Sequence, residues 1–303
     1  MTFKPHLSQN QTVILDTNYT QTLKIKREDL IHPQISGNKY RKLKYNIVQA
    51  RKENKKRLLT FGGAFSNHIL AIAVAGKTFG FETIGVIRGE ELGEKIDTNP
   101  TLKLASAHGM HFKFLSRTDF RNKNSPKLID SLEAEFGDFY LLPEGGTNAL
   151  AVAGCEEILT TEDAEFDYIC CAVGTGGTIA GIINASKPYQ TVLGFPTLAG
   201  DFLKEEICKF AKNSNWQLIS DYHFGGYAKI NTDLISFMNQ FKSDNKIPLD
   251  PIYTGKLVFG VMDLLEKNYF PPNSKILVIH TGGLQGIQGM NEFLKKKQLP
   301  LIS

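Results

Sequence analysis

The sequence has few cysteines, and their spacing would hold neither a metal nor a disulfide framework. Only four occur among 303 residues, at Cys155, Cys170, Cys171 and Cys208, and no two of them form a Cys-x-x-Cys pair. Cys170 and Cys171 lie in an apolar run that is typical of a buried strand, where a thiol acts as a small core residue. The seven histidines are scattered. We therefore expect no structural metal and no disulfide-stapled domain.

Long apolar runs and strongly basic blocks are also missing. No stretch approaches the roughly twenty apolar residues that cross a bilayer, and the residues after Met1 do not lead into an export signal. The 35 basic and 31 acidic residues leave a formal charge of only +4, without a long basic segment interleaved with aromatics. We expect a cytoplasmic protein that binds neither membranes nor nucleic acid.

The sequence does contain an alternation of apolar strand and helix patterns, in a chain long enough to bury a substantial core. This alternation predicts mostly parallel sheets with helices on both faces, arranged in two α/β lobes. We expect strands over 12–15, 22–26, 58–61, 83–87, 111–115, 139–142, 168–173, 192–195 and 275–279, and helices over 40–55, 99–108, 126–136, 150–159, 179–185, 201–212, 232–242, 257–267 and 286–295.

One lysine, Lys39, follows a Gly-Asn pair in the stretch 36–43, where apolar residues begin to recur at helical spacing. Glycine and asparagine suit a turn or a helix cap, so Lys39 is expected near a helix start. A lysine that is held in place and desolvated has a lowered pKa, and its free amine can form a Schiff base with an aldehyde. The alternative is a solvated lysine in a basic helix, since Lys42 and Lys44 follow closely.

A glycine-rich turn over 174–178 follows an expected strand and opens an expected helix. Backbone N–H groups at such a helix start suit a phosphate. The Walker pattern is absent, and the dinucleotide pattern would need glycine where Ile179 stands. A tight turn without any ligand remains the alternative.

A second polar turn, Gly62 to His68, contains Ser66 and Asn67 and could bind a carboxylate, although both residues also suit simple helix capping. It lacks the G-x-S-x-G elbow, which disfavours a serine hydrolase. Polar glycine loops at 143–148 and 279–283 end two further strands. Because strand ends converge on one crevice in α/β sheets, a lysine, a phosphate cradle and a carboxylate cradle together indicate pyridoxal phosphate and a small amino acid.

These segments, taken in order, resemble the pyridoxal-phosphate enzymes of the tryptophan synthase β-subunit fold, also called fold type II. Within that fold they are similar to the family of 1-aminocyclopropane-1-carboxylate (ACC) deaminases and D-cysteine desulfhydrases. The resemblance extends over nearly the whole chain and rests on the segments 26–30, 37–43, 62–68, 174–178, 250–256 and 280–283.

The resemblance implies a role for each matching residue. Lys39 would form the Schiff base and act as the catalytic base, with Ser66 and Tyr253 as further catalytic residues. The substrate would be held by Ser66, Asn67 and His68. The cofactor would be held by Lys39, Asn67, Gly174, Thr175, Gly176, Gly177, Thr178, Thr254 and Thr281.

The family's architecture also implies two domains and an assembly. The larger, cofactor-binding domain would comprise residues 1–47 and 149–303, and a smaller α/β domain would be inserted at 48–148. The active site would lie between them. Family members are usually homodimers, so we expect one here.

The branch of the family is indicated by Thr254 and Thr281, which resemble the D-cysteine desulfhydrases. The ring-opening deaminases have glutamate and leucine at the matching positions. We therefore expect α,β-elimination from D-cysteine, giving pyruvate, sulfide and ammonia. The alternatives are an ACC deaminase, a pyridoxal-phosphate β-replacement synthase, and a non-catalytic cofactor-binding protein of the same fold.

Overall fold

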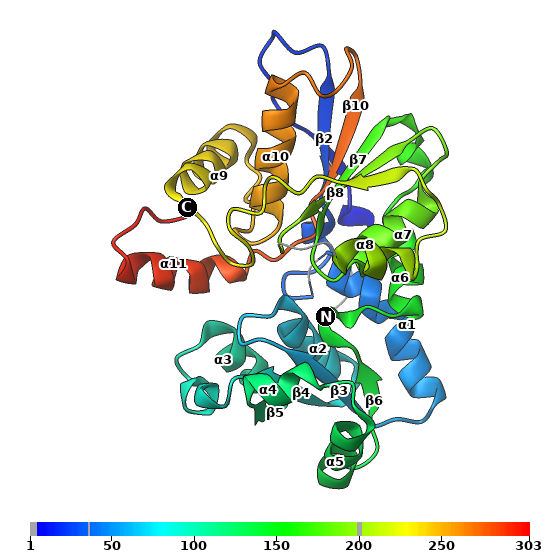
Figure 1. The fold of residues 1–303 in the computed structure, drawn as a ribbon, viewed down its shortest axis with the longest axis vertical. Helices are drawn as coiled ribbons and strands as arrows, with labels where there is room; N and C mark the ends of the chain where they lie inside the picture. Colours follow the sequence, from blue (N-terminus) through cyan, green and yellow to red (C-terminus); the bar gives the residue numbers. More distant parts are fainter. Residues whose placement is uncertain (1–4, 36, 199–201) are drawn as a thin grey trace.

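The fold consists of two sheets whose strands come from different parts of the chain (Figure 1). It is seen in a computed structural model that describes residues 5–35, 37–198 and 202–303. Ser36 of the lysine segment and residue 201 of an expected helix lie outside these ranges. No helix of the described residues is long and apolar enough to cross a membrane.

The larger sheet has six strands in the order β1-β2-β10-β7-β8-β9. Only the pairing of β1 with β2 is antiparallel. The strands are β1 (Asn10–Thr12), β2 (Thr22–Lys26), β10 (Lys275–Ile279), β7 (Tyr168–Val173), β8 (Thr191–Pro196) and β9 (Trp216–Leu218).

The smaller sheet has four strands, all parallel, in the order β5-β4-β3-β6. They are β5 (Met110–Leu115), β4 (Glu82–Arg88), β3 (Arg57–Gly62) and β6 (Tyr140–Leu142). Every strand of this sheet falls within the segment 48–148. The boundaries that we proposed for that domain stay a prediction.

Helices cover both faces of each sheet, as the apolar strand patterns predicted. In β7, Cys170 packs toward α9 and α10, whereas Cys171 packs toward α6, α7 and α8, and both thiols are fully buried. In β3, Leu58 faces α2 and α3, and Leu59 faces α4 and α5. The helices are α1 (Asn38–Lys52), α2 (Asn67–Phe79), α3 (Pro100–Ala107), α4 (Arg117–Arg121), α5 (Pro126–Phe136), α6 (Ala149–Glu156), α7 (Gly177–Ala185), α8 (Phe202–Cys208), α9 (Thr232–Asn245), α10 (Thr254–Glu266) and α11 (Gly286–Lys296).

Several element boundaries differ from the sequence-based expectation. The first strand is β1 at Asn10–Thr12 rather than 12–15, and α8 ends at Cys208 rather than at 212. Helix α10 begins three residues early, at Thr254, because the carboxylate of Asp250 accepts hydrogen bonds from the backbone N–H groups of residues 252–254. These bonds satisfy donors that a helix start would otherwise leave free.

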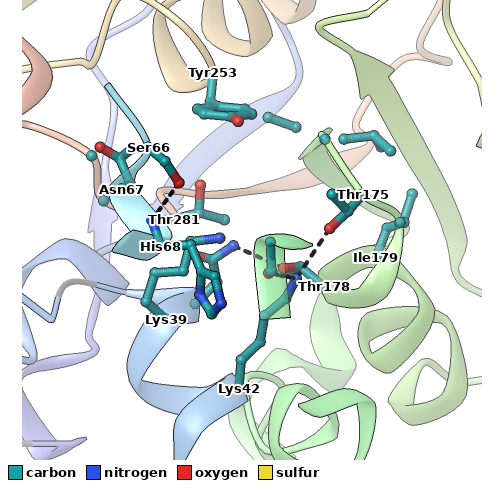
Figure 2. A pocket seen from close by; sticks show the side chains of 18 of the residues that line it. Lys39, Lys42, Ser66, Asn67, His68, Thr175, Thr178, Ile179, Tyr253 and Thr281 are labelled. Carbon is teal, nitrogen blue, oxygen red and sulfur yellow. Dashed lines mark hydrogen bonds between the residues drawn. The ribbon is translucent and has the colours of Figure 1, made fainter. Parts of the chain in front are cut away.

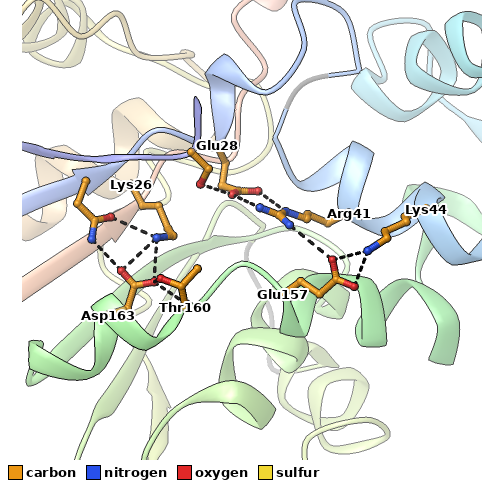
Figure 3. A network of polar contacts seen from close by, with 9 residues as sticks. Lys26, Glu28, Arg41, Lys44, Glu157, Thr160 and Asp163 are labelled. Atoms are coloured by element: carbon orange, nitrogen blue, oxygen red, sulfur yellow. Dashed lines mark hydrogen bonds and ion pairs between the residues drawn. The ribbon is translucent and has the colours of Figure 1, made fainter. Parts of the chain in front are cut away.

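A buried network of charges anchors the start of α1 to the larger sheet (Figure 3). Arg41 Nη2 lies 2.8 Å from Glu28 Oε1, and Arg41 Nη1 lies 3.6 Å from Glu157 Oε2. Nearby, Lys26 Nζ lies 2.8 Å from Asp163 Oδ2, with both side chains almost fully buried. Buried charges need such partners, and Arg41 follows Lys39 by only two residues. The network therefore fixes the part of α1 that carries Lys39.

Candidate active site

Most of the residues singled out in the sequence gather around a cavity between the two sheets (Figure 2). The cavity is lined from the start of α1, the turns before α2 and α7, and the polar loop after β6. It is completed by two tyrosines and by the turn after β10. Its lining residues are 38, 39, 42, 66–68, 145, 172–176, 178, 179, 227, 253 and 281–283.

Lys39 is held at the cavity by an unusual backbone turn. Gly37 has φ +55°, and a Cβ there would lie 2.1 Å from the carbonyl oxygen of Thr281, so no other residue fits. Asn38 donates its backbone N–H to that same carbonyl and its side-chain amide to Thr178 Oγ1, 2.8 Å away. The helix start is thereby attached to the turn after β10 and to α7.

The amine of Lys39 is suited to act as a nucleophile or base. Burial, and the positive charge of Lys42, lower its pKa from an ordinary value of 10.5 to about 7. At neutral pH a large share of Lys39 is therefore the free amine. Figure 2 shows it between the turn of Ser66 and Asn67 and the turn that contains Thr175.

A second lysine, Lys42, belongs to the site although its sequence context suggested a solvated helix face. Its Nζ donates to Gly145 O at 2.9 Å, Thr147 Oγ1 at 3.0 Å and Thr175 Oγ1 at 3.4 Å, and burial lowers its pKa. The available signal was its spacing of three residues from Lys39, which places both on one helix face. A cation thus stands beside the glycine-rich turn.

The glycine-rich turn between β7 and α7 has the features of an anion cradle. Gly176 is the N-cap of α7 with φ +82°, and no side chain caps the helix. A Cβ at Gly174 would lie 3.1 Å from the ring of Tyr253, and one at Gly177 would lie 2.7 Å from Thr147 Oγ1. The uncapped N–H groups are therefore left for an anion. Gly177 itself does not line the cavity.

Ser66 and Asn67 line the cavity from the opposite side. Ser66 caps α2, because its Oγ accepts from the backbone N–H groups of His68 at 3.2 Å and of Ile69 at 3.4 Å. The capping alternative is therefore realised, and the hydroxyl still faces the cavity. Asn67 Oδ1 accepts from Gln285 Nε2 at 3.1 Å, which connects this turn to the segment after β10.

His68 is buried against the two lysines. Its side chain is 1% exposed, and a Cβ at Gly146 would lie 2.6 Å from its Cε1. Burial and the charges of Lys39 and Lys42 hold the pKa of His68 well below its ordinary value. The imidazole is therefore neutral at physiological pH, so that it adds no further charge to the cavity.

The predicted site contains one tyrosine and two threonines, and one of the threonines does not line the cavity. Tyr253 and Thr281 line the cavity. Thr254 is fully buried outside the lining, with its Oγ1 donating to Asp250 Oδ1 at 2.8 Å. Tyr227, which no motif indicated because it lies in an irregular loop, meets Tyr253 with the two ring centroids 6.1 Å apart and the rings nearly perpendicular. Burial raises the pKa of both phenols, which therefore stay protonated.

Several known proteins are similar to this chain in sequence. The family model described as "Pyridoxal-phosphate dependent enzyme" matches residues 11–282. A protein of Pyrococcus horikoshii, named provisionally as an ACC deaminase, is 30% identical over 86% of this chain and 84% of its own. The mitochondrial bifunctional D-cysteine desulfhydrase/ACC deaminase of Arabidopsis thaliana is 30% identical over 87% of this chain and 72% of its own.

Solved structures agree with these sequence matches. A crystal structure of an ACC deaminase homologue superposes with a TM-score of 0.85 at 26% identity, covering 98% of this chain and 95% of that one. The O-acetylserine dependent cystathionine β-synthase of Helicobacter pylori superposes with a TM-score of 0.67 at 15% identity, covering 94% and 97%. The second likeness concerns the fold alone.

Proposed function

This chain belongs to the family of pyridoxal-phosphate dependent enzymes, and we propose that it converts D-cysteine and water to pyruvate, hydrogen sulfide and ammonia. Its relatives include a protein named provisionally as an ACC deaminase and a bifunctional enzyme that carries both the D-cysteine desulfhydrase and the ACC deaminase names. The fold is that of the tryptophan synthase β-like enzymes. The proposal that D-cysteine is the substrate goes beyond what these relatives show.

The cavity residues fit pyridoxal phosphate. The uncapped start of α7 and the neighbouring Lys42 would hold its phosphate, since backbone N–H groups and a buried cation are the partners that a phosphate needs. Lys39, with its lowered pKa, would hold the aldehyde carbon covalently. When bound, the cofactor supplies that aldehyde together with an aromatic ring that accepts the electron pair left at the substrate's Cα.

The chain's own residues would bind the amino acid and move its protons. Ser66 and Asn67, at the start of α2, would hold the α-carboxylate, because a helix start favours an anion. This contact would orient the Cα–H bond toward Lys39, whose free amine would take the proton. The protonated phenol of Tyr253 is suited to donate a hydrogen bond or a proton at the leaving group.

The preference for D-cysteine is carried by the charge of the cavity wall. Among the described residues, no aspartate or glutamate lines the cavity, and Thr281 presents a neutral hydroxyl there. A carboxylate beside the pyridine nitrogen would favour a protonated, strongly electron-withdrawing ring, whereas a hydroxyl favours it much less. Expulsion of a thiolate from Cβ needs less electron withdrawal than opening of an unactivated cyclopropane. ACC deamination is the second candidate, because relatives carry that name.

The decisive assay compares two substrates on the purified holoenzyme. We expect pyruvate and sulfide from D-cysteine, and little or no 2-oxobutanoate from ACC. A clear preference for ACC would overturn this proposal in favour of the second candidate. Assays with L-cysteine test the enantiomer preference in the same format. The homodimer and the cytoplasmic location stay predictions.

A further inference from the structure

An arginine that no motif included lies outside the cavity lining, beside the turn that leads to Ser66. Arg88 ends β4, and its neighbour Ile87 pairs with Gly62 of β3 in the parallel register. Arg88 is therefore beside Gly63, in the turn that leads to Ser66. An ideal Cβ on Gly63 would lie 4.0 Å from Arg88 Nη2, so the guanidinium covers this turn.

Arg88 has no anionic partner in the described part of the chain. Within residues 5–35, 37–198 and 202–303, its guanidinium makes no ion pair with a carboxylate, and it lies over the ring of Phe120, with Cζ 5.9 Å from the ring centroid. The neighbouring cation, Lys123, is already paired with Glu144 at 3.2 Å. Arg88 is also exposed to solvent, so its donors are accessible to a ligand.

Arg88 acts electrostatically on the cavity itself. Its positive charge works to lower the pKa of the cavity-lining Tyr227, against the larger effect of burial. Inside the cavity, Lys42 is the amine held beside the glycine-rich turn, and among the described residues no carboxylate lines the cavity to oppose it. The phosphate of the cofactor would offset Lys42, and the start of α2 would hold the α-carboxylate of an amino acid. Arg88 then remains as a further cation without an anionic partner.

We propose that Arg88 binds a second anionic group at the side-chain end of an amino-acid ligand, so that the site which turns over D-cysteine also binds amino acids with a negatively charged side chain more tightly than their neutral amides. This inference rests on the proposed function, because it takes the turn of Ser66 and Asn67 to hold the α-carboxylate. Arginine suits the task, since its planar fork of donors binds a carboxylate in two places at once. A ligand that reaches from Ser66 to Arg88 would engage the start of α2 with its α-carboxylate and the guanidinium with its side chain.

The test measures ligand binding by the change in cofactor absorbance of the holoenzyme. D-Aspartate and D-asparagine have the same shape and differ in side-chain charge, as do D-glutamate and D-glutamine. We expect the acid to bind about tenfold more tightly than its amide in at least one pair, and the preference to shrink in high salt. Arg88→Gln should reduce this ratio to about one, and Arg88→Lys should retain part of it.

Arg57→Gln is the matched control, because Arg57 starts β3 at the opposite end of the same sheet and pairs there with Glu82. It removes the same charge and should leave the acid-to-amide ratio unchanged. Equal ratios in the parent and in Arg88→Gln would overturn the inference while D-cysteine turnover upholds the proposed function. Equal weakening of acids and amides by Arg88→Gln would also overturn it, because Arg88 would then hold the α-carboxylate. Failure of every amino acid to bind or react would overturn both proposals.

Discussion

Lys39 and Lys42 lie one helical turn apart, yet their surroundings give them different chemistry. Lys42 donates to three oxygen atoms that hold its amine in one place beside the glycine-rich turn. Lys39 faces the cavity, and its pKa is lowered to about 7 by burial and by Lys42. One lysine thus serves as a fixed cation and raises the reactivity of the other.

The lowered pKa of Lys39 predicts how cofactor attachment depends on pH. The free-amine fraction of a group with a pKa near 7 rises about tenfold between pH 6 and pH 8. We therefore expect the rate at which the apoprotein binds pyridoxal phosphate covalently to rise about tenfold between pH 6 and pH 8. The absorbance of the attached cofactor measures this rate. The same pKa shift makes the stability of the fold depend on pH. The free-energy cost of burying Lys39 is largest below pH 7 and decreases as the pH rises toward 10.5.

The attachment site itself is checked by borohydride reduction and peptide mapping. Lys39→Ala should lose both the reducible attachment and turnover, whereas Lys44→Ala, which removes a partner of Glu157 at the surface, should keep both. A modified peptide that carries Lys42 or Lys44 in place of Lys39 would contradict the assignment.

At the scale of elements, the sequence predicted what depends on a local pattern, and it missed very short elements and side chains that are placed by distant contacts. The strand-turn-helix unit of β7 and α7 was predicted because apolar periodicity and glycine spacing are local. The short elements α4 and β9 were not, since five and three residues carry little periodicity. Tyr227 was missed for another reason. It reaches the cavity from an irregular loop, where only the tertiary fold decides the position of a side chain.

The turn before α7 yields a prediction about cofactor retention. Gly176→Val adds a Cβ at φ +82°, 3.1 Å from Ile207 Cγ1, in the backbone segment that would approach the phosphate. Gly109→Val is the control, because Gly109 has φ +86° and open space around it. Both should lose about 1–2 kcal/mol of folding free energy from backbone strain. Only Gly176→Val, or the milder Gly176→Ala, should also weaken cofactor binding, measured by fluorescence titration. Equal cofactor affinity in Gly176→Val and the parent would remove the phosphate from this turn.

On the scale of the whole molecule, the cavity joins two sheets that have separate cores. Ser66 and Asn67 come from the segment after β3, and the glycine-rich turn comes from the segment after β7. Polar contacts connect the two sides near the cavity, such as that of Gln285 with Asn67. A ligand that touches both sides therefore contributes to the association of the two sheets as well as to its own binding.

The final prediction follows from this bridging position. Pyridoxal phosphate at about 100 times its dissociation constant should stabilise the folded chain by about 2.7 kcal/mol. The single tryptophan, Trp216, lies in β9 and reports on the larger sheet, while hydrogen exchange in β3 and β4 reports on the smaller one. We expect the cofactor to raise the urea midpoints from both reporters together. Pyridoxal, which lacks the phosphate, should raise them less, because it leaves the start of α7 and Lys42 without their anion. A shift confined to Trp216 would mean that the cofactor is held by the larger sheet alone, and that the turn of Ser66 and Asn67 closes on the site only when the amino acid binds.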